Sequence, residues 1–129
     1  MTVAYVDASA LTKLVLEEAD SVAMRGWYVE HEHVLCSRVG IVETRRAVGR
    51  HPHDEAHLDV IIRSVDVVEF DIDIARQAAT IAPLTLKTLD AIHLASAVRL
   101  GAVVDAFVTY DDRLATAARA AGLPVVRPA

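Results

Sequence analysis

Four acidic residues occupy places where a carboxylate needs a physical reason, at the end of an apolar strand or inside a helical stripe of small residues: Asp7, Glu43, Asp90 and Asp111. A carboxylate among apolar side chains loses hydration worth several kcal/mol, so it must be paired, protonated or bound to a metal ion. Too few basic residues lie beside these four to pair with each of them. If the fold brings them together, crowded carboxylate oxygens favour Mg²⁺ or Mn²⁺. Such a cluster matches metal-assisted phosphodiester hydrolysis, because a bound ion lowers the pKa of water.

Three of these residues also have a simple structural explanation. Asp7 and Asp111 precede predicted helices, where aspartate is a favoured capping residue. Asp112 could exchange roles with Asp111, and the sequence leaves that choice open. Glu43 could form an ion pair with Arg46, one helical turn later, which is a common surface feature worth tenths of a kcal/mol. The case for a shared site therefore rests on convergence of the four positions.

Asp90 is harder to explain as a surface charge. It shares a helical stripe with Leu94 and Ala97, so we expect its side chain to point inward. Complementing the helix dipole, with Lys87 nearby, accounts for the charge but not for that direction. His93 follows one helical turn later and either packs near the site or satisfies a hydrogen bond in the core.

The elements that must position these residues alternate along the chain. Short apolar runs predict strands at Val3–Val6, Val34–Cys36, Val65–Phe70, Ala106–Thr109 and Pro124–Val126. Helical spacing predicts helices at Ala10–Leu16 with Ser9 as N-cap, Asp20–His31, from the cap Ser37 to about Gly49, Asp54–Arg63, Asp73–Ala82, Thr88–Gly101 and Asp111–Ala121. This order indicates an α/β fold, with a central parallel sheet of four to five short strands flanked by helices. Its ligand crevice should lie beyond the carboxyl ends of the strands.

Length and composition limit the kind of protein. The 129 residues lack a Gly/Ser/Pro-rich linker and are 53% hydrophobic, so we expect one compact domain spanning residues 1–129. The first residues lack the pattern of a secretion signal, and no apolar run reaches membrane-spanning length, which favours a cytoplasmic protein without membrane contact. The single cysteine, Cys36, suits a reducing compartment and is expected to be buried. A net charge of −5 argues against a generic nucleic-acid binder but not against a nuclease, because the acidic site contributes to it.

Four motifs of the chain closely resemble those of the PIN-domain family, and specifically of the VapC toxins of bacterial toxin–antitoxin pairs. The motifs are Tyr5-Val6-Asp7-Ala8-Ser9, Val42-Glu43, Leu89-Asp90-Ala91-Ile92-His93-Leu94-Ala95 and Val108-Thr109-Tyr110-Asp111. Each motif is short, but their order, spacing and predicted strand or helix context are together specific. The resemblance covers almost the whole chain.

The resemblance implies a metal-dependent endoribonuclease. By it, the four acidic residues hold one or two Mg²⁺ or Mn²⁺ ions: Asp7 and Asp90 as direct ligands, Asp111 directly or through water, and Glu43 positioning or helping to deprotonate the attacking water. Ser9 and Thr109 match small hydroxyl positions that orient carboxylates, although capping also explains them. The resemblance further implies an RNA substrate, a homodimer, a VapB-type antitoxin that blocks the site, and inhibition of translation.

Basic residues near the predicted site could contact RNA phosphates, although each is more simply a solvated helix residue: Lys13, Arg38, Arg45, Arg46 and Arg113. Only 5% of the residues are aromatic, which argues against an extended base-stacking surface. Recognition of RNA shape or of a local single-stranded loop is the more natural expectation.

Three other functions remain open from the sequence. A receiver-type phosphoacceptor regulator also gathers acids at strand ends, but it requires a lysine beyond the last core strand, where only Arg127 comes near. A catalytically inactive PIN-like binding module would not need all four acids. A DNA nuclease would need the same site, since nothing in the sequence identifies a contact to the RNA 2′-hydroxyl.

Overall fold

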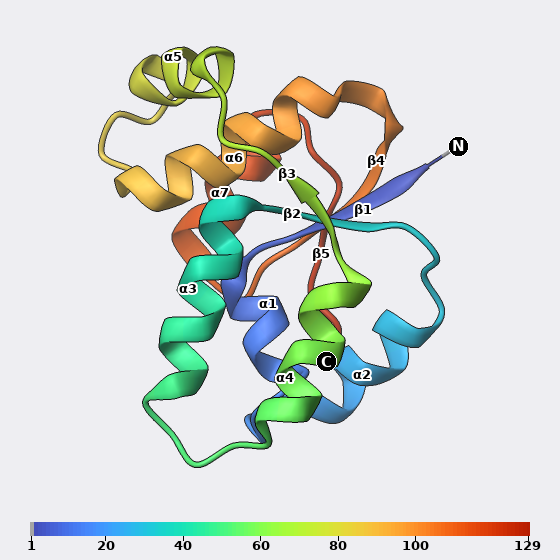
Figure 1. The fold of residues 1–129 in the computed structure, drawn as a ribbon. Helices are drawn as coiled ribbons and strands as arrows, with labels where there is room; N and C mark the ends of the chain where they lie inside the picture. Colours follow the sequence, from blue (N-terminus) through green and yellow to red (C-terminus); the bar gives the residue numbers. More distant parts are fainter. Residues whose placement is uncertain (1) are drawn as a thin grey trace.

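The computed structural model describes residues 2–129 as an α/β domain in which five parallel strands alternate with helices (Figure 1). The strands are β1 (Val3–Val6), β2 (Val34–Ser37), β3 (Asp66–Val68), β4 (Val104–Val108) and β5 (Val125–Val126). The helices are α1 (Ala8–Lys13), α2 (Ser21–Val29), α3 (Arg38–Gly49), α4 (Glu55–Ser64), α5 (Ile72–Thr80), α6 (Thr88–Leu100) and α7 (Asp112–Ala120), and a 3₁₀ turn, η1 (Gly101–Val103), precedes β4. The predicted α/β class and the flanked parallel sheet are confirmed.

The sheet has the order β3-β2-β1-β4-β5, and all its pairs are parallel. The chain therefore adds strands outward from the central strand β1, first β2 and β3 on one side and then β4 and β5 on the other. A receiver domain has the flavodoxin-like order 2-1-3-4-5, so this topology excludes the receiver-type alternative. The change of direction beside β1 is also where an open α/β sheet forms its ligand crevice.

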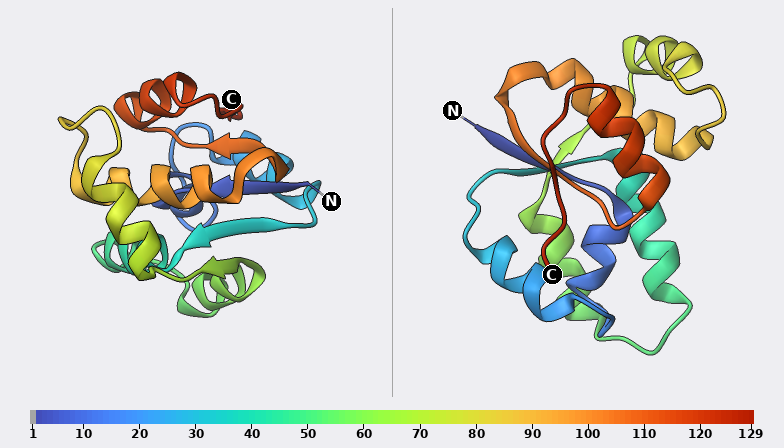
Figure 2. Two further views of the ribbon diagram at one scale, coloured as in Figure 1. Left: turned by 90° about the horizontal axis from the view of Figure 1, so that it is seen from above. Right: turned by 180° about the vertical axis from the view of Figure 1, so that it is seen from behind.

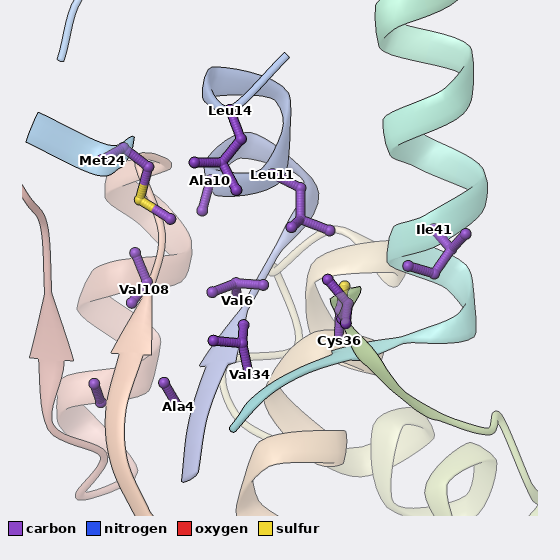
Figure 3. Close-up of a cluster of buried hydrophobic side chains, with 12 residues drawn as sticks. Ala4, Val6, Ala10, Leu11, Leu14, Met24, Val34, Cys36, Ile41 and Val108 are labelled. Atoms are coloured by element: carbon purple, nitrogen blue, oxygen red, sulfur yellow. The ribbon is translucent and has the colours of Figure 1, made fainter. Parts of the chain in front are cut away.

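Strand β1 is buried on both faces because helices cover both sides of the sheet. Ala4 and Val6 contribute to one apolar cluster, which α1, α2 and α3 complete with Leu11, Met24 and Ile41 (Figure 3). Buried Cys36 from β2 belongs to this cluster, as predicted. Side chains alternate across a strand, so an unbroken apolar run is what a strand covered on both faces requires.

The opposite face of the sheet packs against α6 and α7. Tyr5 joins Phe107 from β4, Leu94 from α6 and Leu114 from α7 in a second buried cluster. Tyr5 and Phe107 stack with ring centroids 5.4 Å apart and an interplanar angle of 4°. Helix α5 lies beside α6 at the periphery of the domain (Figure 2).

The predicted boundaries differ from the structure mainly at helix starts. Ser9 is not the cap of α1; Asp7 is, because its side chain accepts a hydrogen bond from the backbone N–H of Ala10. Strand β3 is shorter than the predicted Val65–Phe70, and α5 begins earlier, at Ile72, where Asp71 supplies the cap. In both helices an aspartate side chain sets the start, which apolar periodicity alone does not locate.

Helices α3 and α6 approach each other closely at Gly40. A Cβ atom at this position would lie 2.7 Å from Cε1 of His93 and still closer to Sγ of Cys36. Glycine is therefore required here by space rather than by backbone conformation. The contact brings α3, which carries Glu43, against α6, which carries Asp90.

We expect Gly40→Ala to destabilise the protein by about 1–3 kcal/mol, because the added methyl group overpacks a buried contact. Gly49→Ala on the same helix is the matched control, since nothing lies within 4 Å of a Cβ there. That control should be neutral or slightly stabilising, as alanine favours helix over glycine. Chemical denaturation measures both variants. Equal stability of the two would contradict the close approach of α3 and α6.

Candidate active site

The four predicted acidic residues reach the same edge of the sheet from four segments. Asp7 follows β1 and Asp111 follows β4, while Glu43 lies in α3 and Asp90 in the first turn of α6. In Figure 1 this edge is on the left, where β1, β2 and β4 lead into α1, α3 and α7. The parallel direction of the strands therefore brings the segments that carry these residues to one edge, as the predicted fold requires.

Asp7 is a buried carboxylate with a hydrogen bond to each oxygen. Its Oδ1 accepts from the hydroxyl of Ser9 at 2.6 Å and from the backbone N–H of Ala10 at 3.0 Å. Its Oδ2 accepts from the hydroxyl of Thr109 at 2.6 Å. Burial raises the pKa of Asp7, and the hydrogen bonds from these donors oppose that shift without cancelling it. The hydroxyl groups thus hold one orientation of a side chain that also caps α1.

Asp90 is half-buried, and its electrostatics show that the acidic residues act on one another. Its pKa is raised to about 6, mainly by burial, and repulsion from Asp111, Asp7 and Glu43 contributes to that shift. A capping aspartate on an open surface would not have its pKa raised in this way. Asp90 therefore lies in the field of the other three carboxylates, as a shared site requires.

Asp111 and Asp112, which the sequence could not tell apart, have different partners. Asp111 caps α7 by accepting a hydrogen bond from the backbone N–H of Leu114 at 2.8 Å. Asp112 is the first residue of α7 and forms an ion pair with Arg127 at 2.8 Å. Because Asp111 raises the pKa of Asp90 and Asp112 is held by an arginine, Asp111 is the better candidate for the site.

Glu43 is held by a residue whose role the sequence left open. Its Oε1 lies 2.7 Å from Nε2 of His93, whose side chain is only 1% exposed. Nδ1 of the same ring lies 2.8 Å from the hydroxyl oxygen of Tyr5. His93 thus both packs at the site and satisfies core hydrogen bonds. Its position one helical turn after Asp90 indicated one or the other of these roles, but only the fold could show that it meets α3.

Two hollows flank the acidic edge, and they carry different basic residues. A groove of about 520 Å³ beside Glu43 is lined by Lys13, Arg46 and Arg50. A smaller hollow contains Asp90, Asp111 and Arg113. The sequence did not single out Arg50, which lies four residues after Arg46 and caps the C-terminus of α3. A larger, mostly apolar hollow lies between α7 and the segment before α6, and Arg113 also belongs to its lining.

Two of the predicted basic residues, Arg38 and Arg45, are engaged elsewhere, whereas Lys13 has its partners within the groove. Arg38 binds Glu69, and Arg45 binds Asp59 at 3.1 Å, on the side of α3 away from the groove. Lys13 contacts Glu18 and also lies 4.6 Å from the ring centroid of Tyr110. For Arg38 and Arg45, the simpler interpretation as solvated surface residues therefore describes their surroundings.

The donors at this edge are of the kind that Mg²⁺ and Mn²⁺ prefer. Across residues 2–129, Asp7, Asp90 and Asp111 form no ion pair with lysine or arginine, so their charge is open to a cation. In the same part of the chain, no three acidic, histidine or cysteine side chains lie close enough together to hold a metal ion by themselves. Mg²⁺ keeps several waters and needs only one or two carboxylates. The residues therefore fit a partly hydrated hard cation rather than a fully enclosed one.

Comparison with known proteins gives the class of the fold. A model of the PIN domain matches residues 4–120. The solved structure of VapC20 from Mycobacterium tuberculosis, described as a sarcin-ricin loop cleaving toxin, aligns with a TM-score of 0.74 and 23% identity, over 96% of this chain and 98% of that one. VapBC2 from Rickettsia felis, solved bound to a DNA fragment from its promoter, aligns with a TM-score of 0.72 and 11% identity over 98% of each chain. At such identities these two structures support the fold alone.

A curated relative places the chain more narrowly. Ribonuclease VapC47 from Mycobacterium tuberculosis (strain CDC 1551 / Oshkosh) is 35% identical over 130 residues, which cover 96% of each chain. The chain therefore belongs to the PIN-domain family, and this relative within the family is a ribonuclease of the VapC type. No helix within residues 2–129 is both long and apolar enough to cross a membrane.

We expect Asp90→Asn to stabilise the metal-free protein near neutral pH. The pKa of Asp90 is raised from 3.8 to about 6, so folding favours the protonated form. Its contribution is fully present below pH ~4 and is lost as the pH rises through about 6. In EDTA at pH 7.5 the variant should gain about 1 kcal/mol, after allowance for solvent screening of a half-exposed group. The gain should disappear at pH 4.5.

Thermal unfolding at both pH values measures this effect. Asp105→Asn is the control, since Asp105 is exposed near the opposite end of β4. An Asp90→Asn variant with the wild-type dependence of melting temperature on pH would contradict the crowding of the acidic residues.

Proposed function

We propose that this chain is an endoribonuclease that uses Mg²⁺ or Mn²⁺ bound by Asp7, Asp90 and Asp111, with Glu43 acting on the attacking water. The observation that supports it most strongly is the hollow that Asp90 and Asp111 line together, in which neither carboxylate is paired with a lysine or arginine of residues 2–129. The ribonuclease relatives support cleavage of RNA in particular. The unit of function is the whole domain, residues 1–129.

Each residue of the site has a separate role in this proposal. When bound, the divalent ion supplies an acidic water and positive charge beside the scissile phosphate. Asp7 presents a carboxylate whose orientation Ser9 and Thr109 fix through its two oxygens. Glu43 uses one oxygen to bind His93 and keeps Oε2 to accept a proton from water. Asp112 keeps Arg127 close to the edge without competing for the ion.

Phosphate binding falls to basic residues that line the two hollows. Arg46 and Arg50 lie on the groove side of α3, and Arg113 lies beside Asp90. Phosphate contacts dominate affinity for nucleic acids and fix the position of the strand without reading its sequence. With few aromatic residues in the chain, we expect selection of RNA by shape or by a local single-stranded loop.

The biological setting is carried over from relatives. A solved neighbour contains VapBC2 bound to promoter DNA, and VapC47 is named a ribonuclease. We therefore propose a VapB-type antitoxin that occupies the acidic edge, a homodimer, a cytoplasmic location and inhibition of translation by RNA cleavage. The antitoxin would supply the positive charge that the acidic edge lacks in the isolated chain.

We expect purified protein to cleave RNA in the presence of Mg²⁺ or Mn²⁺. Asp7→Asn and Asp90→Asn should each lower the rate at least about 100-fold, because they remove charge that the transition state needs. Gel electrophoresis of a labelled hairpin RNA and of the matching DNA measures the activity. Asp105→Asn, at the other end of β4, should cleave like the wild type.

Metal binding has an independent readout. Mn²⁺ should raise the melting temperature of the wild type, as any ligand of the folded state does, and not that of Asp7→Asn. Mn²⁺ binding without cleavage of either nucleic acid would favour the inactive binding module. Cleavage of DNA but not RNA would assign a DNA nuclease, and unchanged cleavage by both aspartate variants would refute the site.

We expect Arg46→Gln and Arg50→Gln to weaken RNA binding. Arg45→Gln is the matched control on the same helix, because Arg45 binds Asp59 and Glu55 away from the groove. Fluorescence anisotropy over a range of salt concentrations measures affinity, in an Asp7→Asn background that leaves the RNA intact. Each lost phosphate contact should reduce the slope of log affinity against log salt by about 0.7. An equal effect of Arg45→Gln would refute the groove as the phosphate-binding surface.

A further inference from the structure

His93 occupies an unusual place, since it is buried in the core and yet touches a candidate catalytic residue. Its ring is 1% exposed and lies in α6, one helical turn after Asp90. Both ring nitrogens have a partner: Nδ1 lies 2.8 Å from the hydroxyl of Tyr5, and Nε2 lies 2.7 Å from Oε1 of Glu43. The ring therefore connects the face of the sheet that carries Tyr5 with the edge that carries Glu43.

The partners determine which ring nitrogen carries the proton. An ionised carboxylate only accepts hydrogen bonds, so Nε2 must donate to Glu43. In a neutral imidazole Nδ1 is then the acceptor, and the hydroxyl of Tyr5 donates to it. The oxygen of Tyr5 itself accepts the backbone N–H of Ser37 at 3.1 Å. The result is a directed chain of hydrogen bonds from Ser37 through Tyr5 and His93 to Glu43.

Each member of this chain is fixed by packing. Tyr5 is fully buried against Phe107, and burial raises the pKa of its hydroxyl group, which therefore keeps its proton. The rings of Tyr5 and His93 meet edge to face, with centroids 5.8 Å apart and an interplanar angle of 74°. On its other side the imidazole has only the space that Gly40 leaves by lacking a Cβ. The ring cannot turn away from Glu43 without a cost to the core.

We propose that His93 is a positioning residue for the hydrolysis: Tyr5 fixes its tautomer, and its Nε2–H holds Oε1 of Glu43, so that Oε2 is presented to the attacking water. This inference rests on the proposed function and assigns a role to a side chain that touches neither the RNA nor the metal ion. It also explains the side-chain volume at position 40, since any larger residue there would displace the imidazole.

The kinetic test compares two amides at position 93. In His93→Gln the side-chain nitrogen can take the place of Nε2 and donate to Glu43, whereas the shorter His93→Asn reaches only the region of Nδ1. We expect kcat to stay within a few-fold of the wild type for His93→Gln and to fall about 10–100-fold for His93→Asn, with KM unchanged in both. Tyr5→Phe should lower kcat about as much as His93→Asn does, because without the tyrosine hydroxyl the imidazole proton is no longer kept on Nε2.

Melting temperatures measured beside the kinetics separate positioning from folding. Loss of kcat in parallel with stability, equally for both amides, would overturn the proposal. Wild-type kcat in His93→Asn would overturn it too. Because kcat is measured on folded protein at saturating RNA, a general loss of stability cannot reproduce the expected difference between glutamine and asparagine.

A spectroscopic test needs neither RNA nor metal ion. Nitrogen NMR of histidine-labelled wild type should show His93 as the neutral Nε2–H tautomer, and Tyr5→Phe should reduce the share of that tautomer. Finding the Nδ1–H tautomer or the imidazolium in the wild type would overturn the proposal. If the wild type fails to cleave RNA, the proposed function fails, while the spectrum still decides whether this hydrogen-bond chain exists.

Discussion

The structure depends on one constraint, a carboxylate placed at the end of the central, doubly covered strand. Asp7 lies where β1 leaves the core, and burying its carboxylate costs hydration free energy that nearby hydrogen bonds must offset. Two hydroxyl groups and one backbone N–H donate these hydrogen bonds, from Ser9, Thr109 and Ala10. Because Thr109 follows β4, satisfying this single side chain also ties the two most extensively paired strands together beyond their last ladder bonds. The other acidic residues then gather around a fixed point rather than a flexible one.

Much of this arrangement could be predicted from the sequence. Unbroken apolar runs identify strands covered on both faces, and parallel strands must deliver the residues that follow them to one edge, which is why Asp7 and Asp111 were placed together. The inward direction of Asp90 followed from helical periodicity. Helix starts were less accurate, because an aspartate cap such as Asp71 acts through one side-chain hydrogen bond that the apolar pattern does not contain.

Other features depend on contacts between distant segments and could not be predicted. Arg45 forms ion pairs with Glu55 and Asp59 of α4, whereas Arg46 lines the groove, and this difference depends on where the fold places α4 relative to α3. The two neighbours have the same chemistry in the sequence and opposite surroundings in the fold. Likewise, an acidic residue and a histidine fifty positions apart meet only because α3 and α6 approach at a glycine. Such pairings belong to tertiary packing, where local preferences carry little information.

The absence of a side chain at position 40 has an evolutionary consequence. The room beside Gly40 is filled by the sulfur of Cys36 and the ring of His93, and the ring in turn rests on Tyr5. A substitution at any one of these positions changes the volume or the hydrogen bonding available to the others. They should therefore vary together among homologues: a lineage that exchanges both the cysteine and the histidine for smaller residues becomes free to place alanine or serine on α3. The residue at position 40 of a homologue would then indicate whether that protein uses a histidine to hold the glutamate one helical turn later.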